Sequence, residues 1–167
     1  ISPAVLHGQP WVYTANDSIE ESVTLFFFGD VMQHSPQIKG AFDVTTNEHN
    51  YMHCFQYIRP YWQQADYVIA NLETTLTNRN YSGYPNFCAP WQLARDLKAS
   101  GVDILTTNNN HSCDKGAAGI RKTIYYLDSL EFPHLGTYLD SASWFNQTPM
   151  LIEHGNFKIA LLTYTYG

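Results

Sequence analysis

Short apolar runs that stop at glycine or polar residues recur along this chain, and such runs are typical of buried β-strands. The last two runs flank a Gly-Asn turn, which predicts a hairpin. Segments with helical periodicity lie between the earlier runs. The order strand, helix, strand, helix and then hairpin predicts an α/β fold whose sheet contains both parallel and antiparallel strand pairs. The predicted strands are residues 23–28, 67–70, 103–107, 134–138, 150–153 and 158–162.

Helical periodicity occupies segments between these strands. Residues 116–130 place four apolar side chains on one face and predict the longest helix. Residues 90–100 predict a second helix, which ends at Gly101. Residues 52–64 have broadly helical spacing, which Pro60 bends or shortens.

The pattern predicts one domain with an N-terminal extension. Residues 1–22 are mixed and polar, and we expect them to form an arm or a lead-in strand. Residues 23–167 are expected to form the domain, truncated at its C-terminus because the last apolar strand has no covering helix after it. Residues 29–50 are expected to be a long loop, and residues 78–90 a turn-rich stretch.

Charge and cysteine content argue against several classes of binding partner and of structural site. The 167 residues carry nine Lys and Arg against fifteen Asp and Glu, a formal net charge of −6, which argues against nucleic acid as the main partner. An anionic substrate would need a locally positive site, which a divalent cation supplies more readily than scattered Lys and Arg. No apolar run is long enough to cross a bilayer. Three cysteines without a Cys-x-x-Cys pair predict neither a disulfide framework nor a structural zinc site.

Three consecutive predicted strands end in acidic, amide or imidazole side chains. Asp30 follows the first strand, Asn71 and Glu73 follow the second, and residues 109–114 follow the third. If the strands are parallel, right-handed crossovers bring these ends to one rim of the sheet, where open α/β sheets bind ligands. Such an oxygen–nitrogen donor set suits Mg, Mn, Zn or Fe, and a metal held there can activate water and neutralise a phosphoryl or carbonyl oxygen.

Each of these residues also has an ordinary structural interpretation. Asp30 suits a turn, and His111 suits a buried histidine with satisfied hydrogen bonds. Asp114 suits the N-cap of the helix at 116–130, the role we favour for that residue taken alone. The shared position at three strand ends favours a common site over coincidence.

Three further histidines are weaker candidates. His34 lies four residues after Asp30 and is a candidate ligand or substrate contact. His49 and His53 have the four-residue spacing of a metal-binding pair on a helix. They straddle the predicted start of a helix, however, and we expect ordinary surface roles for both.

The chain contains three ordered motifs: Gly-Asp-Val-Met at 29–32, Ala-Asn-Leu-Glu-Thr-Thr-Leu at 70–76 and Asn-Asn-His-Ser-Cys-Asp-Lys-Gly at 109–116. These motifs resemble those of the CapA-type poly-γ-glutamate capsule-synthesis proteins, the PGA-cap family. The resemblance extends over residues 23–167 and implies a fold similar to the calcineurin-like metallophosphoesterases, a β-sandwich with flanking helices and a metal centre at the strand ends. We expect the chain to hold only the N-terminal part of that fold.

The resemblance also implies roles for individual residues. Asp30, Glu73 and Asn110 match metal ligands, and the metal is a divalent Mn, Mg, Zn or Fe ion. His111 matches the histidine that stabilises or protonates the reacting group, with Asp114 orienting it or capping the helix. The sequence departs from the expected pattern in two ways. Glu73 stands where phosphoesterases commonly use Asp, and the sequence lacks the later His-Trp-Gly-like motif of the family. We assign substrate contacts to His34, Asn71 and Asn109.

Two functional hypotheses follow from the resemblance. One is metal-dependent hydrolysis or transfer at a phosphoryl or acyl-type bond during cell-surface polymer assembly. The other is a non-catalytic accessory that binds or guides an anionic surface polymer. Both imply an anionic polymer or a phosphorylated or γ-glutamyl substrate, a membrane-anchored polymer-synthesis complex, and an extracytoplasmic location at the cell surface or in the periplasm. A purely structural interpretation treats the three motifs as strand-end turns.

Overall fold

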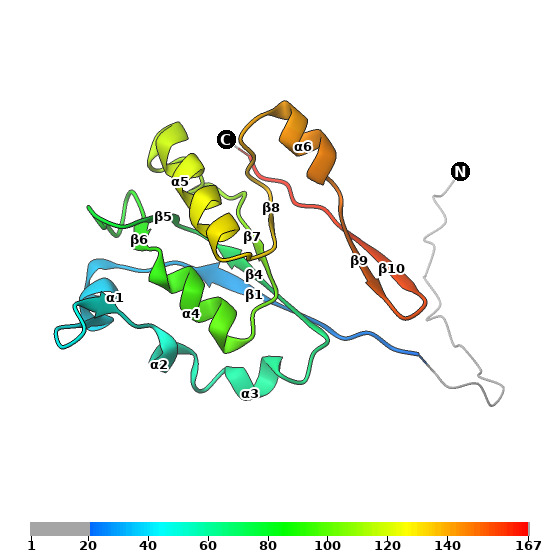
Figure 1. Cartoon of the computed structure of the whole chain (residues 1–167), viewed down its shortest axis with the longest axis horizontal. Helices are drawn as coiled ribbons and strands as arrows, with labels where there is room; N and C mark the ends of the chain where they lie inside the picture. Colours follow the sequence, from blue (N-terminus) through cyan, green and yellow to red (C-terminus); the bar gives the residue numbers. More distant parts are fainter. Residues whose placement is uncertain (1–20, 167) are drawn as a thin grey trace, which may run out of the picture.

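A four-stranded parallel sheet forms the centre of the protein. A computed structural model describes residues 21–166, and its strands β1 (Leu25–Val31), β4 (Tyr67–Leu72), β7 (Ile104–Thr106) and β8 (His134–Leu135) pair in the order β1-β4-β7-β8 (Figure 1). All three pairings are parallel. The predicted α/β class is confirmed. The expectation of mixed pairing within one sheet is wrong, because the C-terminal hairpin forms a separate two-stranded sheet.

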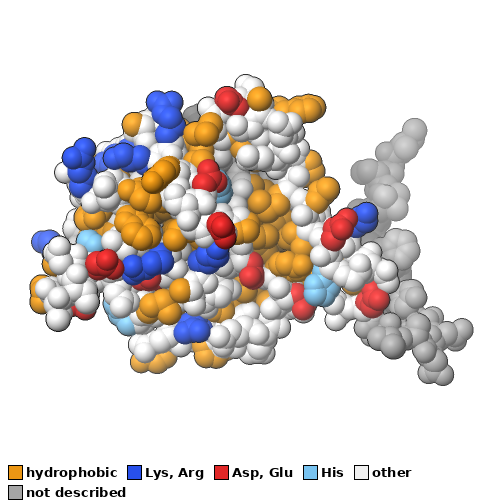
Figure 2. All heavy atoms as spheres, in the orientation of Figure 1, with side chains coloured by type: hydrophobic (Ala, Val, Ile, Leu, Met, Phe, Trp, Pro, Cys, Tyr) orange, Lys and Arg blue, Asp and Glu red, His pale blue; other side chains and the backbone are white. Residues whose placement is uncertain are grey.

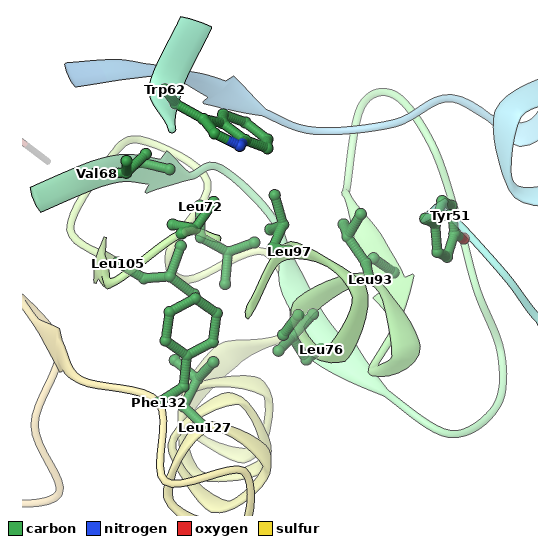
Figure 3. Close-up of a cluster of buried hydrophobic side chains, with 14 of the residues drawn as sticks. Tyr51, Trp62, Val68, Leu72, Leu76, Leu93, Leu97, Leu105, Leu127 and Phe132 are labelled. Atoms are coloured by element: carbon green, nitrogen blue, oxygen red, sulfur yellow. The ribbon is translucent and has the colours of Figure 1, made fainter. Parts of the chain in front are cut away.

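Helices and the larger hydrophobic cluster lie on one face of this sheet. The predicted helices are present as α4 (Gln92–Ser100) and α5 (Gly116–Ser129), and α4 ends at Gly101, whose φ of 104° is left-handed. Alternate strand side chains, including Leu72 and Leu105, point toward this face and pack against Leu97, Leu127 and Phe132 (Figure 3). Burial on both faces explains why the central strands are almost continuously apolar.

The hairpin packs against the other face of the sheet. Strands β9 (Met150–His154) and β10 (Phe157–Leu161) pair antiparallel, as predicted for the Gly155-Asn156 turn. Ile152 of the hairpin joins Ile69 and Ile104 of the central strands in a second buried cluster.

Several short elements occupy segments that the hydrophobic pattern left as loop. The expected loop at 29–50 holds one helix and two strands, and the expected helix at 52–64 is two short helices separated just before Pro60. The predicted N-terminal arm, residues 1–22, lies almost entirely outside the described residues. The additional elements are α1 (Ser35–Gly40), β2 (Phe42–Asp43), β3 (Glu48–His49), α2 (Met52–Phe55), α3 (Arg59–Trp62), β5 (Thr75–Thr77), β6 (Cys88–Pro90) and α6 (Ser141–Gln147).

Within residues 21–166, no helix combines the length and the apolar character needed to cross a bilayer.

A bulge in β1 brings the first acidic residue toward β4. Phe28 pairs with Ala70 and Val31 pairs with Leu72, so three steps along β1 match two along β4. At the bulge the two backbones approach closely, because a Cβ added to Gly29 would lie 2.8 Å from the Cβ of Asn71. Glycine at this position therefore sets the spacing between the ends of the two strands.

We predict that Gly29→Ala destabilises the protein by about 1–3 kcal/mol, because the new methyl group must displace Asn71 or the β1 backbone. Urea unfolding measures the change. Gly40→Ala is the matched control: nothing lies within 4 Å of its added Cβ, and alanine favours the helical backbone there. A Gly29→Ala protein as stable as Gly40→Ala would contradict the close approach.

Candidate functional site

Two carboxylates meet at the ends of β1 and β4. The side-chain amide of Asn71 donates to Asp30 Oδ1 at 2.7 Å and to Glu73 Oε2 at 3.1 Å. The backbone N–H of Glu73 donates to the carbonyl of Val31 at 2.9 Å, which fixes the two strand ends against each other. Asp30 and Glu73 therefore lie together, as the strand order predicted.

Asn109 connects the third strand end to the second. Its Nδ2 donates to Asn71 Oδ1 at 3.1 Å and to the carbonyl of Leu72 at 2.9 Å. Its Oδ1 accepts the backbone N–H of His111 at 3.0 Å, so the same side chain also shapes the loop after β7. Thr106 adds a hydroxyl bond to Asn71 Oδ1 at 3.3 Å, a contact that the sequence analysis did not anticipate.

His111 and Asp114 form a hydrogen-bonded pair. His111 Nδ1 lies 2.8 Å from Asp114 Oδ2, which also accepts the backbone N–H of Phe87 at 2.6 Å. The Phe87 ring packs edge-on against the imidazole, with ring centroids 4.6 Å apart. With Nδ1 held by a carboxylate, Nε2 is the nitrogen left for proton exchange.

The structure corrects the interpretation of Asp114 as a helix cap. Lys115 occupies the N-cap position of α5, and the Asp114 carboxylate bonds to His111 and Phe87 instead. Phe87 was missed because it lies in a stretch predicted to be turns. Its position in the sequence gives no sign that its backbone reaches the loop after β7.

The paired carboxylates differ in exposure. Asp30 is exposed, whereas the Glu73 side chain is buried, with 8% of its surface accessible. Burial raises the pKa of the Glu73 carboxyl, and the hydrogen bond and charge of Asp30 raise it further. The charge of His111 and the hydrogen bond from Asn71 lower that pKa in part. Among residues 21–166, no Lys or Arg forms an ion pair with either carboxylate.

Two predicted site residues are exposed and form no side-chain hydrogen bond to the acidic pair within the described residues. Asn110 is exposed, and no hydrogen bond joins its side chain to the acidic pair within the described chain. His34 is also exposed, and its ring packs edge-on against Phe87 with centroids 5.4 Å apart. Phe87 contacts the rings of both histidines, so His34 lies at the rim of the site rather than among the carboxylates.

The expectation of a surface role for His49 is wrong. His49 is buried in β3, and its ring contacts Phe42, Tyr51 and Tyr81. Burial lowers the pKa of its imidazole, so the neutral form is favoured. Its partner in the four-residue spacing, His53, is exposed in α2.

The donor set bears on whether a metal ion fits. Two carboxylates held side by side without a cationic partner suit a hard divalent ion, which prefers oxygen ligands. Within the part of the chain that the structure describes, no group of three or more His, Cys, Asp or Glu side chains is arranged to hold a metal. Asp30 and Glu73 therefore place two carboxylates side by side at the strand ends, without a third such side chain grouped with them in the described residues.

Comparison with known proteins identifies the family. The model for "Bacterial capsule synthesis protein PGA_cap" matches residues 24–167. The chain belongs to this family. Membership in the PGA_cap family confirms the resemblance drawn from the three motifs, all of which lie inside the matched range.

Three relatives are each much longer than the part that this PGA_cap chain matches. The capsule biosynthesis protein CapA of Bacillus anthracis is 25% identical over 124 residues, which cover 70% of this chain and 28% of that protein. The PGA biosynthesis protein CapA of Bacillus subtilis (strain 168) is 27% identical over 124 residues, 69% of this chain and 29% of that one. Protein y4sH of Sinorhizobium fredii (strain NBRC 101917 / NGR234) is 32% identical over 108 residues, 59% of this chain and 23% of its own length. The chain therefore spans less than a third of each relative.

We predict that Glu73→Gln stabilises the metal-free PGA_cap chain at neutral pH. A pKa raised by folding means that Glu73 favours the folded state below its unfolded pKa, and that this contribution is lost as the pH rises through the folded pKa. Ionised Glu73 therefore costs stability at pH 7, and Gln removes this cost while retaining the shape. We expect Tm in EDTA to rise by a few degrees, as a change of about 1 kcal/mol produces in a chain of this length.

Calorimetry across pH in EDTA tests this expectation. The gain should shrink toward pH about 4, where wild-type Glu73 is largely protonated. Glu153→Gln is the control, because Glu153 is an exposed partner of Lys158 on the hairpin and should leave Tm almost unchanged. A lower Tm for Glu73→Gln at pH 7 would show that the buried carboxylate is stabilising.

Proposed function

We propose that this chain supplies the acidic and acid–base residues of a metal-dependent hydrolase or transferase that acts in capsule or poly-γ-glutamate assembly. One observation carries the proposal. Hydrogen bonds connect Asp30, Asn71 and Glu73 to the His111–Asp114 loop through the side chain of Asn109. A structural turn needs no such convergence of two carboxylates, an imidazole and a third carboxylate.

Asp30 and Glu73 are the residues that would hold a divalent cation, with Asn110 as a further ligand suggested by the family resemblance. When bound, a divalent cation polarises a phosphoryl or carbonyl oxygen and lowers the pKa of water. The raised pKa of Glu73 agrees with this role, because a carboxylate that lacks a cation is poorly satisfied when buried.

His111 and Asp114 provide the proton-transfer group. Asp114 holds His111 Nδ1, which fixes the ring orientation and leaves Nε2 to donate a proton to a leaving oxygen or nitrogen. The edge-on Phe87 ring packs against the imidazole and restricts its rotation. Asn109 positions the backbone of His111 relative to the carboxylates.

The substrate, partners and location belong to the same proposal. The names of the CapA relatives mention capsule biosynthesis and PGA biosynthesis. These names favour an anionic polymer, or a phosphorylated or γ-glutamyl precursor, as the substrate. We place the activity outside the cytoplasm, at the cell surface or in the periplasm, within a membrane-anchored polymer-synthesis complex. We also propose that the β9–β10 hairpin begins the second layer of a metallophosphoesterase-type sandwich, because it packs on the sheet face opposite α4 and α5.

A non-catalytic accessory that binds or guides the anionic polymer is the second candidate. Within residues 21–166 the carboxylate pair lacks a third His, Cys, Asp or Glu ligand, and this observation favours it. In that case the strand ends would contribute to binding without turnover.

We predict chelator-sensitive hydrolysis of bis(p-nitrophenyl) phosphate or γ-glutamyl-p-nitroanilide in the presence of Mn²⁺. His111→Ala should lower kcat by about 10²–10⁴, the usual contribution of general acid–base catalysis, and Asp114→Asn should lower kcat while KM changes little. His154→Ala, on the hairpin beside Tyr67 at the start of β4, is the control and should retain full activity.

Any of three results would contradict the proposed enzyme activity. The first is a hydrolysis rate that EDTA does not change, the second is wild-type turnover by His111→Ala, and the third is no turnover of either compound. The third result, with poly-γ-glutamate binding retained, would instead support the accessory role.

A further inference from the structure

We infer that a basic groove between α5 and the β5–β6 pair binds the carboxylates of a linear polyanion and leads it toward His111. The groove encloses about 270 Å³ and is lined by three cationic side chains, Arg79, Lys115 and Lys122, over a floor that includes Leu76 and Gly119. This inference rests on the proposed function, because it names the site through which an anionic polymer reaches the strand ends.

The groove concentrates positive charge on an acidic protein. Three of the nine Lys and Arg residues line it, and its lining includes no Asp or Glu. None of the three forms an ion pair with another described residue, whereas Arg95 and Lys158 each pair with an acidic neighbour. Figure 2 shows Lys and Arg side chains gathered over the end of the molecule formed by α5 and the β5–β6 pair.

Close packing of α5 on β5 builds the groove. The backbone N–H of Leu76 donates to Thr123 Oγ1 at 2.9 Å, which ties the strand to the helix. A Cβ added to Gly119 would lie 2.6 Å from the Cβ of Lys115 and 3.3 Å from Cγ2 of Thr75. The absence of a side chain at Gly119 therefore leaves room for Lys115 between the helix and the strand.

The groove begins beside the proton-transfer pair. Lys115 directly follows Asp114, the residue that holds His111, and it is the N-cap of α5 without using its side chain as a cap. Within residues 21–166 its ammonium group forms no ion pair, so it can contact a ligand. Asp30 and Glu73 repel an approaching polyanion, and the basic groove supplies the attraction that offsets this repulsion.

The size and exposure of the groove favour a polymer over a single small anion. Arg79 and Lys122 are exposed, and an ion pair at an exposed cation contributes little by itself. A cavity of about 270 Å³ accommodates one acidic repeat unit. Tight binding therefore needs several linked units that engage the cations together, and it should weaken as salt screens these contacts.

The test compares Arg79→Gln/Lys115→Gln/Lys122→Gln with a control of equal charge, Lys39→Gln/Arg121→Gln/Lys158→Gln. The control residues are exposed and lie outside the groove, Arg121 on the same helix. Binding of labelled poly-γ-glutamate is measured by fluorescence polarisation at low and high salt, with circular dichroism to verify folding. We expect the groove variant to lose at least about tenfold in affinity, and the control less than about twofold.

Several outcomes overturn the inference. Equal losses in both triple variants would show that net charge alone attracts the polymer. Affinity that salt does not change would exclude ion pairing, and binding of inorganic polyphosphate without binding of poly-γ-glutamate would assign the groove to phosphates. His111→Ala separates this inference from the proposed function: it should lose hydrolysis of bis(p-nitrophenyl) phosphate and retain polymer binding.

Discussion

The hydrogen bonds of the Asn71 side chain hold the ends of three parallel strands in one arrangement. Its amide nitrogen donates to both Asp30 and Glu73, and its oxygen accepts from Asn109 and Thr106. Parallel pairing alone brings the strand ends to one rim, but it does not prevent two neighbouring carboxylates from turning apart. A neutral donor between them keeps both in place without cancelling their charge, so the pair stays available to a cation.

The two neighbouring carboxylates destabilise the folded state at the strand ends, and burial of the hydrophobic core offsets this cost. Glu73 is buried beside a second carboxylate, whereas the adjoining cluster contains Trp62, Leu97 and Leu105, which are completely buried. Large apolar side chains of this kind contribute a few kcal/mol each when buried, enough to fix the strands despite repulsion at their ends. A buried acidic group that is maintained in this way is typical of functional sites rather than of turns.

The sequence revealed the strands and their convergence more readily than the contacts between side chains. Apolar runs before Asp30 and Asn71 identified strands because these are buried on both faces, and right-handed parallel order placed their ends together. The reach of Phe87 to Asp114 depends on β5 and β6, three residues each, which are too short for a periodic signal. The exposure of Asn110 follows from the path of one loop, which residue types do not specify.

The distribution of charge connects the site to its surroundings. A net charge of −6 suggests a protein that repels anions, yet three cationic side chains line one groove. In the chain, Asn109, which bonds to Asn71 beside the acidic pair, precedes the His111–Asp114 loop, and Lys115 of the groove follows it. The proposed cation and the proposed polyanion would therefore be held by different residues. Because Asp114 and Lys115 are adjacent in the chain, the loop that orients the imidazole leads directly into a residue that lines the groove.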